Sequence, residues 1–109
     1  MDGIKVRETI HEMVRRIVVG FSPEKIILFG SHARGNIDTD SDVDLLVVMH
    51  VSGSKRKKAA EIDRALYGTG LPKDVIVVTP EEVEKYQNIV GTVIYPALHE
   101  GKVLYERRS

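Results

Sequence analysis

The chain has 109 residues, of which 42% are hydrophobic and 29% are charged, which is ordinary for one folded domain. It contains no cysteine, which excludes disulfide frameworks, thiolate zinc sites and cysteine nucleophiles. Its 16 basic residues balance its 16 acidic residues, so the overall charge does not indicate tight binding to a nucleic acid backbone. No apolar run approaches the roughly 20 residues of a membrane span, and the N-terminus does not resemble a signal peptide. We therefore expect a single cytoplasmic domain over residues 1–109.

The first half of the chain predicts a helix followed by two strands. Apolar residues recur at helical spacing over residues 4–18, and Gly20 ends that pattern. Residues 25–29 are short, apolar and partly β-branched, which is typical of a buried strand. Residues 42–48 predict a second strand. The polar segment 30–40 between them is a loop with room for one helical turn.

The second half alternates helices and strands. We predict, in order, a helix over 55–67, a strand over 74–78, a helix that begins at Thr79, a helical segment over 90–99 and a short strand over 103–105. Pro96 leaves the continuity of the helical segment open, because proline has no N–H group to donate. The order of elements predicts a mixed α/β (α+β) domain in which helices flank a small mixed sheet.

Asp42 and Asp44 are the first candidate site residues. They lie two positions apart on a predicted strand, so both side chains leave the same face. Two carboxylates this close repel each other unless a cation lies between them. Mg²⁺ suits such a pair, because it takes a few carboxylates and completes its coordination with water and phosphate oxygens. The same spacing also occurs on solvated strand ends, so the pair alone leaves both interpretations open.

Gly30 and Ser31 stand at the end of the first predicted strand. Because glycine has no Cβ, it lets backbone N–H groups and a neighbouring hydroxyl approach phosphate oxygens closely. Arg34, on the same loop, adds a guanidinium that suits a phosphate contact or a brace for the loop. The alternative is an ordinary turn between a strand and a helix.

Asp74 heads the third predicted strand, after a turn rich in glycine and proline. An acid at such a position is often only a polar strand end. If this strand lies beside the strand of Asp42, however, three carboxylates converge. Three carboxylates around one or two divalent cations, together with a phosphate-binding loop, indicate a centre for phosphoryl or nucleotidyl transfer.

The combined pattern, G-S-x-A-R-G followed by S-D-x-D-L, resembles the signature of the DNA polymerase β-like nucleotidyltransferase superfamily. More narrowly, it resembles the minimal nucleotidyltransferases of bacteria and archaea. The matching residues are Gly30, Ser31, Ala33, Arg34, Gly35, Ser41, Asp42, Asp44 and Leu45. The resemblance covers essentially the whole chain and implies the polymerase β-like fold.

The resemblance also implies a role for each candidate residue. Gly30 and Ser31, with Arg34 beside them, would bind the triphosphate of ATP. Asp42 and Asp44 would ligate Mg²⁺, with two ions expected in such a site. Asp74 would be the third metal-ligating carboxylate and the general base that activates the attacking hydroxyl.

A protein partner is implied as well. Minimal nucleotidyltransferases of this kind are similar to the antitoxin half of a toxin–antitoxin module. Their partner is a helical HEPN-domain ribonuclease, which is neutralised when AMP is added to a tyrosine. Because little of the chain lies outside the catalytic core, we expect a separate chain to hold the acceptor. One departure is the loop over 36–40, which carries Asp38 and Asp40 where relatives often carry a basic residue. The two acids in this loop predict either weaker binding of phosphate or contact with a basic partner.

Two other functions stay open. The fold could neutralise its partner by occlusion alone, with vestigial acids, although a binding module has no need of a repulsive acid cluster. It could instead modify a small molecule, although so short a chain offers no second wall for a substrate pocket unless a dimer supplies one.

The four histidines are predicted to be structural or exposed. His11 is expected at the surface or boundary of the first helix. His32 occupies the free position of the motif and is expected to face solvent. His50 and His99 lack partners at metal-binding spacing, so no zinc site can be assembled.

The basic run Lys55–Lys58 has two interpretations. It is either the solvated start of a helix or a contact for RNA or an acidic partner. The tyrosines do not form a stacking platform for bases, which argues against single-stranded nucleic acid recognition. We expect Tyr95 and Tyr105 to lie in the core or at a partner interface.

Overall fold

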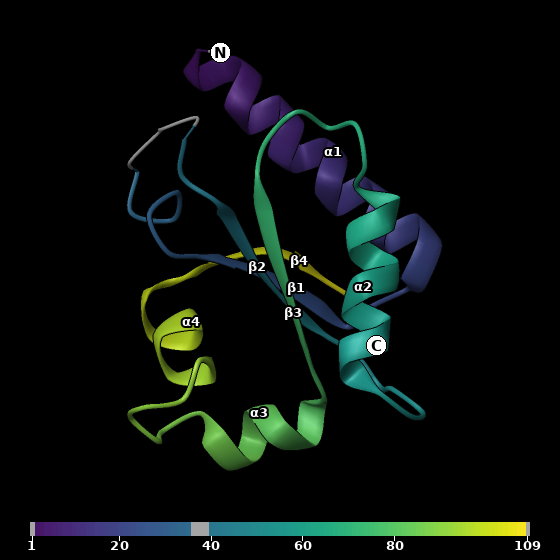
Figure 1. Ribbon diagram of the computed structural model, residues 1–109. Helices are drawn as coiled ribbons and strands as arrows, with labels where there is room; N and C mark the ends of the chain where they lie inside the picture. The colour runs from purple at the N-terminus through teal and green to yellow at the C-terminus, as the bar shows by residue number, and fades with distance from the viewer. Residues whose placement is uncertain (1, 36–39, 109) are drawn as a thin grey trace.

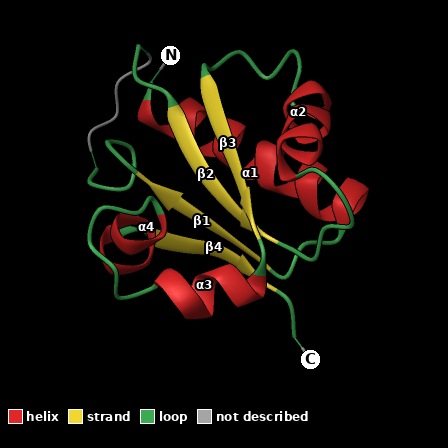
Figure 2. Ribbon diagram, turned by 60° about the horizontal axis from the view of Figure 1, so that its bottom comes forward, coloured by secondary structure: helices red, strands yellow, loops and turns green. Residues whose placement is uncertain are grey.

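The computed structural model describes residues 2–35 and 40–108, and a four-stranded sheet runs through its middle (Figure 1). In chain order, its elements are α1 (Gly3–Phe21), β1 (Lys25–Phe29), β2 (Val43–Val48), α2 (Lys55–Ala65), β3 (Lys73–Val78), α3 (Pro80–Tyr86), α4 (Ile94–Glu100) and β4 (Lys102–Glu106). Helices α1 and α2 cover one face of the sheet, and α3 and α4 cover the other (Figures 1 and 2). The predicted fold class is confirmed.

The strand order is β3-β2-β1-β4, and the sheet is mixed. β1 is antiparallel to both β2 and β4, whereas β2 and β3 are parallel. The parallel pair is joined through α2, because parallel strands need a long crossover connection. Since β1 runs opposite to β2, the end of β1 lies beside the start of β2 and one strand away from the start of β3. Three chain segments distant in sequence therefore meet at one end of the sheet.

The sheet separates two apolar cores. The α1/α2 face buries one helix stripe and alternate residues of the central strands, including Val6, Ile10, Met13, Ile17, Ile26, Val43, Leu45, Val47 and Ile62. The α3/α4 face buries the intervening positions, namely Ile27, Leu46, Val48, Val78, Ile94 and Ala97. Burying each such side chain contributes roughly 1.5–3 kcal/mol, so the two central strands are held from both sides.

Local signals set the ends of the helices. The Asp2 side chain caps α1 by accepting from the Lys5 N–H at 2.9 Å, and α1 ends at Ser22 in the left-handed conformation. α3 starts where the sequence predicts, with a capping box between Thr79 and Glu82. Among the described residues, no helix has the length and apolar character needed to cross a membrane.

The helical segment predicted over 90–99 is shorter in the structure. α4 begins only at Ile94, and Pro96 lies in its first turn. N–H groups in the first turn of a helix have no partner within the helix, so the missing N–H of proline is tolerated there. The last strand is longer than predicted, because β4 spans Lys102–Glu106. The acidic loop over 36–40 cannot be compared, since residues 36–39 lie outside the described part of the chain.

Candidate active site

The three predicted acids lie at the end of the sheet where β1 ends and β2 and β3 begin. Asp44, the second residue of β2, pairs in register with Asp74, the second residue of β3. Side chains alternate along a strand, so Asp44 shares a face with Leu46, and Asp74 with Ile76, on the α3/α4 side. Asp42 lies one residue before β2 and two before Asp44. The structure therefore places Asp44 and Asp74 on neighbouring strands of one face, with Asp42 just before β2.

Gly30 lies directly after β1 and approaches the side chain of Asp44 closely. Its φ of 76° lies in the left-handed region, which an L side chain rarely adopts. A Cβ built on Gly30 would collide with the Asp44 carboxylate oxygen Oδ2. Gly30, which the sequence assigns to phosphate binding, therefore also contacts the side chain of Asp44.

Burial and two acidic neighbours set the electrostatic environment of Asp44. Burial raises the pKa of the Asp44 carboxyl, and the charges of Asp74 and Asp42 raise it further. The positive fields of His32 and Arg34 lower the pKa again, by less. Like charges that oppose the ionisation of a half-buried carboxylate are typical of a site that binds a cation.

The Gly30–Gly35 segment forms a tight turn. The N–H groups of Ala33, Arg34 and Gly35 donate to the carbonyl oxygens three residues earlier, at 3.1–3.3 Å. This is the single helical turn that the loop was predicted to have room for. Ser31 is half-buried in the turn, and Arg34 is exposed. The structure therefore places all three predicted phosphate-binding residues beside the acids, at the end of β1.

His32 corrects a prediction. We expected it to face solvent, but only 7% of it is exposed. Its Nε2 lies 3.0 Å from the carbonyl oxygen of Ser41, the residue just before Asp42, so it links the turn to the segment that carries the acids. In the described part of the chain its other nitrogen, Nδ1, is buried without a partner. No sequence signal marks this role, because the motif leaves the position free.

The donor chemistry of this end of the sheet fits a hard divalent cation. Asp42, Asp44 and Asp74 offer carboxylate oxygens, and the repulsion that raises the Asp44 pKa is what a bound cation relieves. Within residues 2–35 and 40–108, no group of three or more carboxylate or imidazole side chains is arranged to hold a metal ion by itself. A Mg²⁺ held by these acids would therefore draw further ligands from nucleotide phosphates and water.

The other singled-out residues have structural partners. In the basic run, Lys55 pairs with Glu82 and Lys58 with Glu61, the latter at 2.9 Å, as a solvated helix start predicts. His50 contacts Glu24 and Glu81, and the ring centres of His99 and Tyr95 lie 4.2 Å apart. His11 is exposed, and Tyr105 is half-buried.

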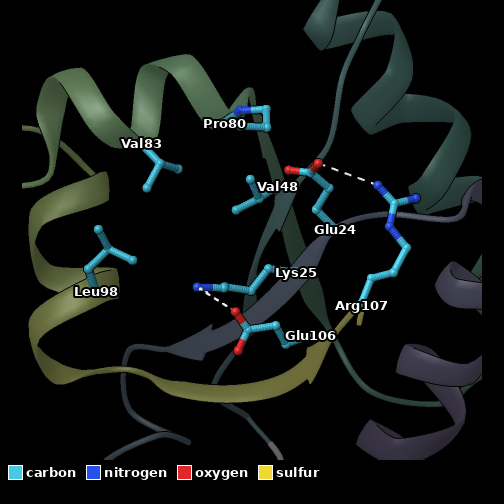
Figure 3. A pocket seen from close by; sticks show the side chains of 8 residues that line it. All are labelled: Glu24, Lys25, Val48, Pro80, Val83, Leu98, Glu106 and Arg107. Atoms are coloured by element: carbon cyan, nitrogen blue, oxygen red, sulfur yellow. Dashed lines mark hydrogen bonds and ion pairs between the residues drawn. The ribbon is translucent and has the colours of Figure 1, made fainter. Parts of the chain in front are cut away.

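A cavity of about 410 Å³ lies on the α3/α4 face, at the end of the sheet away from the acids (Figure 3). Val48, Val83 and Leu98 give it an apolar lining. Two ion pairs border it, Lys25 with Glu106 and Arg107 with Glu24, each at 3.4 Å. None of the predicted site residues lines this cavity, so it is separate from the acidic site.

The fold and the acids define a phosphate-handling transferase, and the comparison with known families identifies it. The chain belongs to the nucleotidyltransferase domain family, which it matches over residues 6–97. That range contains the Gly30–Gly35 turn and all three acids. The enzyme class predicted from the sequence, a nucleotidyltransferase, is confirmed.

A relative from Methanocaldococcus jannaschii is named as a candidate protein adenylyltransferase. It is 28% identical over 72 residues, which are 66% of this chain and 59% of the relative. The match thus spans less than two-thirds of that protein's length.

Solved structures show the same fold. A protein of Sulfolobus solfataricus described as a candidate nucleotidyltransferase has a TM-score of 0.64 at 21% identity, over 94% of this chain and 84% of its own. A mutant of the toxin–antitoxin pair MntA–HpeT has a TM-score of 0.54 at 17% identity, over 90% and 73%. A toxin–antitoxin structure with AMP-PNP has a TM-score of 0.50 at 21% identity, over 93% and 73%.

Proposed function

We propose that this nucleotidyltransferase transfers AMP from ATP to a hydroxyl group of a partner protein, with Mg²⁺, and that it serves as the antitoxin of a toxin–antitoxin pair. The observation that carries the proposal is that Asp44 and Asp74 pair in register on neighbouring strands, with Gly30 close to the carboxylate of Asp44. The name of the Methanocaldococcus relative supports protein adenylylation. The toxin–antitoxin structures with the same fold support the antitoxin role.

The reaction exchanges one phosphorus–oxygen bond for another. The acceptor oxygen forms a bond to the α-phosphorus while the bond from the α-phosphorus to the bridging oxygen of the β-phosphate breaks, and pyrophosphate leaves. Asp74 takes the acceptor proton. Its exposed position at the start of β3 lets a hydroxyl from another molecule reach it.

Asp42, Asp44 and Asp74 would hold two Mg²⁺ ions, which neutralise the triphosphate and lower the pKa of the acceptor hydroxyl when bound. The turn after β1 binds the phosphates. Gly30 has no side chain to obstruct them, Ser31 adds a hydroxyl, and Arg34 adds a guanidinium.

We propose a tyrosine of a helical HEPN-domain toxin as the acceptor. A tyrosine hydroxyl stands far from its own backbone, so it can reach acids at the rim of a sheet without insertion of the acceptor backbone. The cavity of about 410 Å³ lies at the opposite end of the sheet, so it does not provide a small-molecule pocket at the acids.

The test is transfer of radioactive label from ATP in lysate of the host. The protein is incubated with Mg²⁺ and ATP labelled at either the α or the γ phosphate, beside Asp44→Asn and a matched control, Glu84→Gln, on exposed α3. We expect α-label on one protein band with wild type and Glu84→Gln, and none with γ-label or Asp44→Asn. Mass spectrometry of the band identifies the modified residue.

Other outcomes separate the alternatives. Label on RNA or on a small molecule would retain the transferase and refute the antitoxin assignment. If the partner co-purifies with the chain and is neutralised equally by Asp44→Asn, neutralisation occurs by occlusion and the catalytic proposal is wrong.

A further inference from the structure

A groove lies between α1 and β4, on the face of the sheet opposite the acids. It consists of two adjoining hollows of about 220 and 320 Å³, which share His11 and Leu104. We call it the α1–β4 groove. Its lining includes Gly3, Val6, Arg7, Ile10, His11, Val14, Arg15, Val18, Val19, His32, Lys102, Leu104 and Tyr105. None of these residues belongs to the three acids or to the phosphate contacts.

The groove exists because two helices do not cover four strands. α2 lies over β3, and α1 is held against α2 by Arg16, whose guanidinium donates to the carbonyl oxygens of Ala65 and Tyr67 at 3.3 and 3.0 Å. β4 is the edge strand on the other side. On this edge Leu104 and Tyr105 are only half-buried, so the helical layer stops before the sheet does.

α1 has a second stripe that faces this gap. Its core stripe consists of Val6, Ile10, Met13 and Ile17. At about 100° per residue, a neighbouring stripe follows at Gly3, Arg7, His11, Val14 and Val18, and these residues all line the groove. Val14 and Val18 pack against the core but are only half-buried, so part of their apolar surface remains for a second packing partner.

The charge of the groove has one sign. Arg7, His11, Arg15 and Lys102 line it, and among the described residues no carboxylate does. Of the described ion pairs, none involves Arg7 or Lys102, whereas Arg15 pairs with Glu12 at 2.8 Å. The chain as a whole has no net charge, so this basic lining is a local concentration.

The shape of the groove suits a helix better than a strand. β4 has only five residues, and its pairing with β1 shifts between Ile26 and Ile27, an irregularity that hinders addition of another strand. Along α1, by contrast, the stretch from Gly3 to Val19 is about 24 Å long at 1.5 Å per residue, which matches a helix of four to five turns.

We propose that the α1–β4 groove is the docking site for an acidic amphipathic helix of a partner protein. Its apolar stripe lies on Val14, Val18 and Leu104, and its carboxylates face Arg7 and Lys102. Docking on this face leaves the acids on the opposite face free for the acceptor. The inference rests on the proposed function in one respect only, namely that the docked protein is the one that carries the acceptor hydroxyl.

The probes are two synthetic 18-residue helical peptides with the same leucine stripe, one with glutamate and one with lysine at the polar positions. Binding is measured by fluorescence anisotropy and mapped by backbone amide chemical shifts. We expect the acidic peptide to bind, with shifts confined to α1, β4 and the adjoining turn, and the basic peptide not to bind. Affinity should fall as salt rises.

Charge reversal separates the groove from general attraction. The double variant Arg7→Glu/Lys102→Glu should weaken binding of the acidic peptide at least tenfold. The matched control Arg56→Glu/Lys57→Glu reverses two exposed basic residues of α2, outside the groove, and should leave it unchanged. Because all four side chains are exposed, both variants should fold, which circular dichroism checks.

Three results would overturn the proposal: no binding of the acidic peptide, equal binding of the basic one, or equal loss in both double variants. Asp44→Asn should bind the peptide like wild type while it transfers no AMP. If peptide binding follows the groove but wild type transfers no label, the proposed function fails and the docking surface stands.

Discussion

Gly30→Ala should abolish transfer while it leaves the fold intact. The new Cβ would collide with Oδ2 of Asp44 and lie within 3.2 Å of its Cγ. The carboxylate can avoid the clash by rotating, so the fold loses only the backbone penalty of alanine at positive φ, about 1–2 kcal/mol. The rotation removes the central acid from the site. We expect a loss of about 10³-fold in rate, which corresponds to about 4 kcal/mol of transition-state stabilisation.

The chain supplies matched controls for the backbone strain. Gly35 and Gly53 also have positive φ, 83° and 98°, but among the described residues no atom beyond the chain neighbours lies within 4 Å of a Cβ built at either position. Gly35 lies in the same turn, and Gly53 lies beyond the other end of β2. Gly35→Ala and Gly53→Ala should therefore lower the free energy of unfolding about as much as Gly30→Ala does. They should lower the rate of transfer much less.

The assay is α-label transfer under single-turnover conditions, beside thermal unfolding of the four proteins. If Gly30→Ala retains activity within a few-fold of Gly35→Ala, the contact with Asp44 does not position the acid and the reasoning is refuted. If Gly30→Ala unfolds while both controls fold, the clash acts on the backbone and the activity loss proves nothing about Asp44.

Further predictions concern the same site. Because burial and the charges of Asp74 and Asp42 raise the folded-state pKa of Asp44, stability should fall in metal-free buffer as pH rises above about 3.8; Asp44→Asn should raise Tm at pH 7, and the gain should vanish below pH 3.8, as calorimetry can show. Mg²⁺ at 100-fold above its Kd should stabilise wild type by about 2.7 kcal/mol but not Asp44→Asn, measured by the shift in Tm; an equal shift would place the ion elsewhere. Asp74→Asn should lower the rate of transfer with little effect on the KM for ATP, and its pH–rate profile should lose the limb of the general base. His32→Gln should retain more transfer than His32→Leu, because an amide N–H can still donate to the Ser41 carbonyl; equal losses would show that only the volume of His32 matters.

The two central strands were predictable because each is apolar at nearly every position. Lys25–Phe29 and Val43–Val48 are buried on both faces, which removes the ambiguity of a one-sided pattern. The start of α3 was predictable for a different reason, since its capping box is entirely local in sequence. α4 was harder, because its first cap, Val93, makes no side-chain hydrogen bond that a pattern could reveal.

The acids were predictable as a set only in part. The spacing of Asp42 and Asp44 is local, so the strand predicted over 42–48 gives them a shared face, although β2 begins only at Val43. The position of Asp74 depends on β3 lying parallel beside β2 with residue 74 opposite residue 44, and a shift by one residue would turn its carboxylate to the α1/α2 face. Sequence spacing cannot set that register; the buried strand residues that pack against α3 and α4 do so.

His32 shows why a residue outside the motif pattern can matter to the site. The turn after β1 and the segment before β2 are joined through residues 36–39, and the backbone register of β1 with β2 ends at the pair Phe29–Asp44. Beyond that pair, no ladder hydrogen bond between described residues holds the turn to the acids. The contact from His32 to the Ser41 carbonyl supplies the link, and only a buried side chain could do so, because an exposed one would exchange the hydrogen bond with water. The burial that contradicts the prediction is therefore the physical condition for its role.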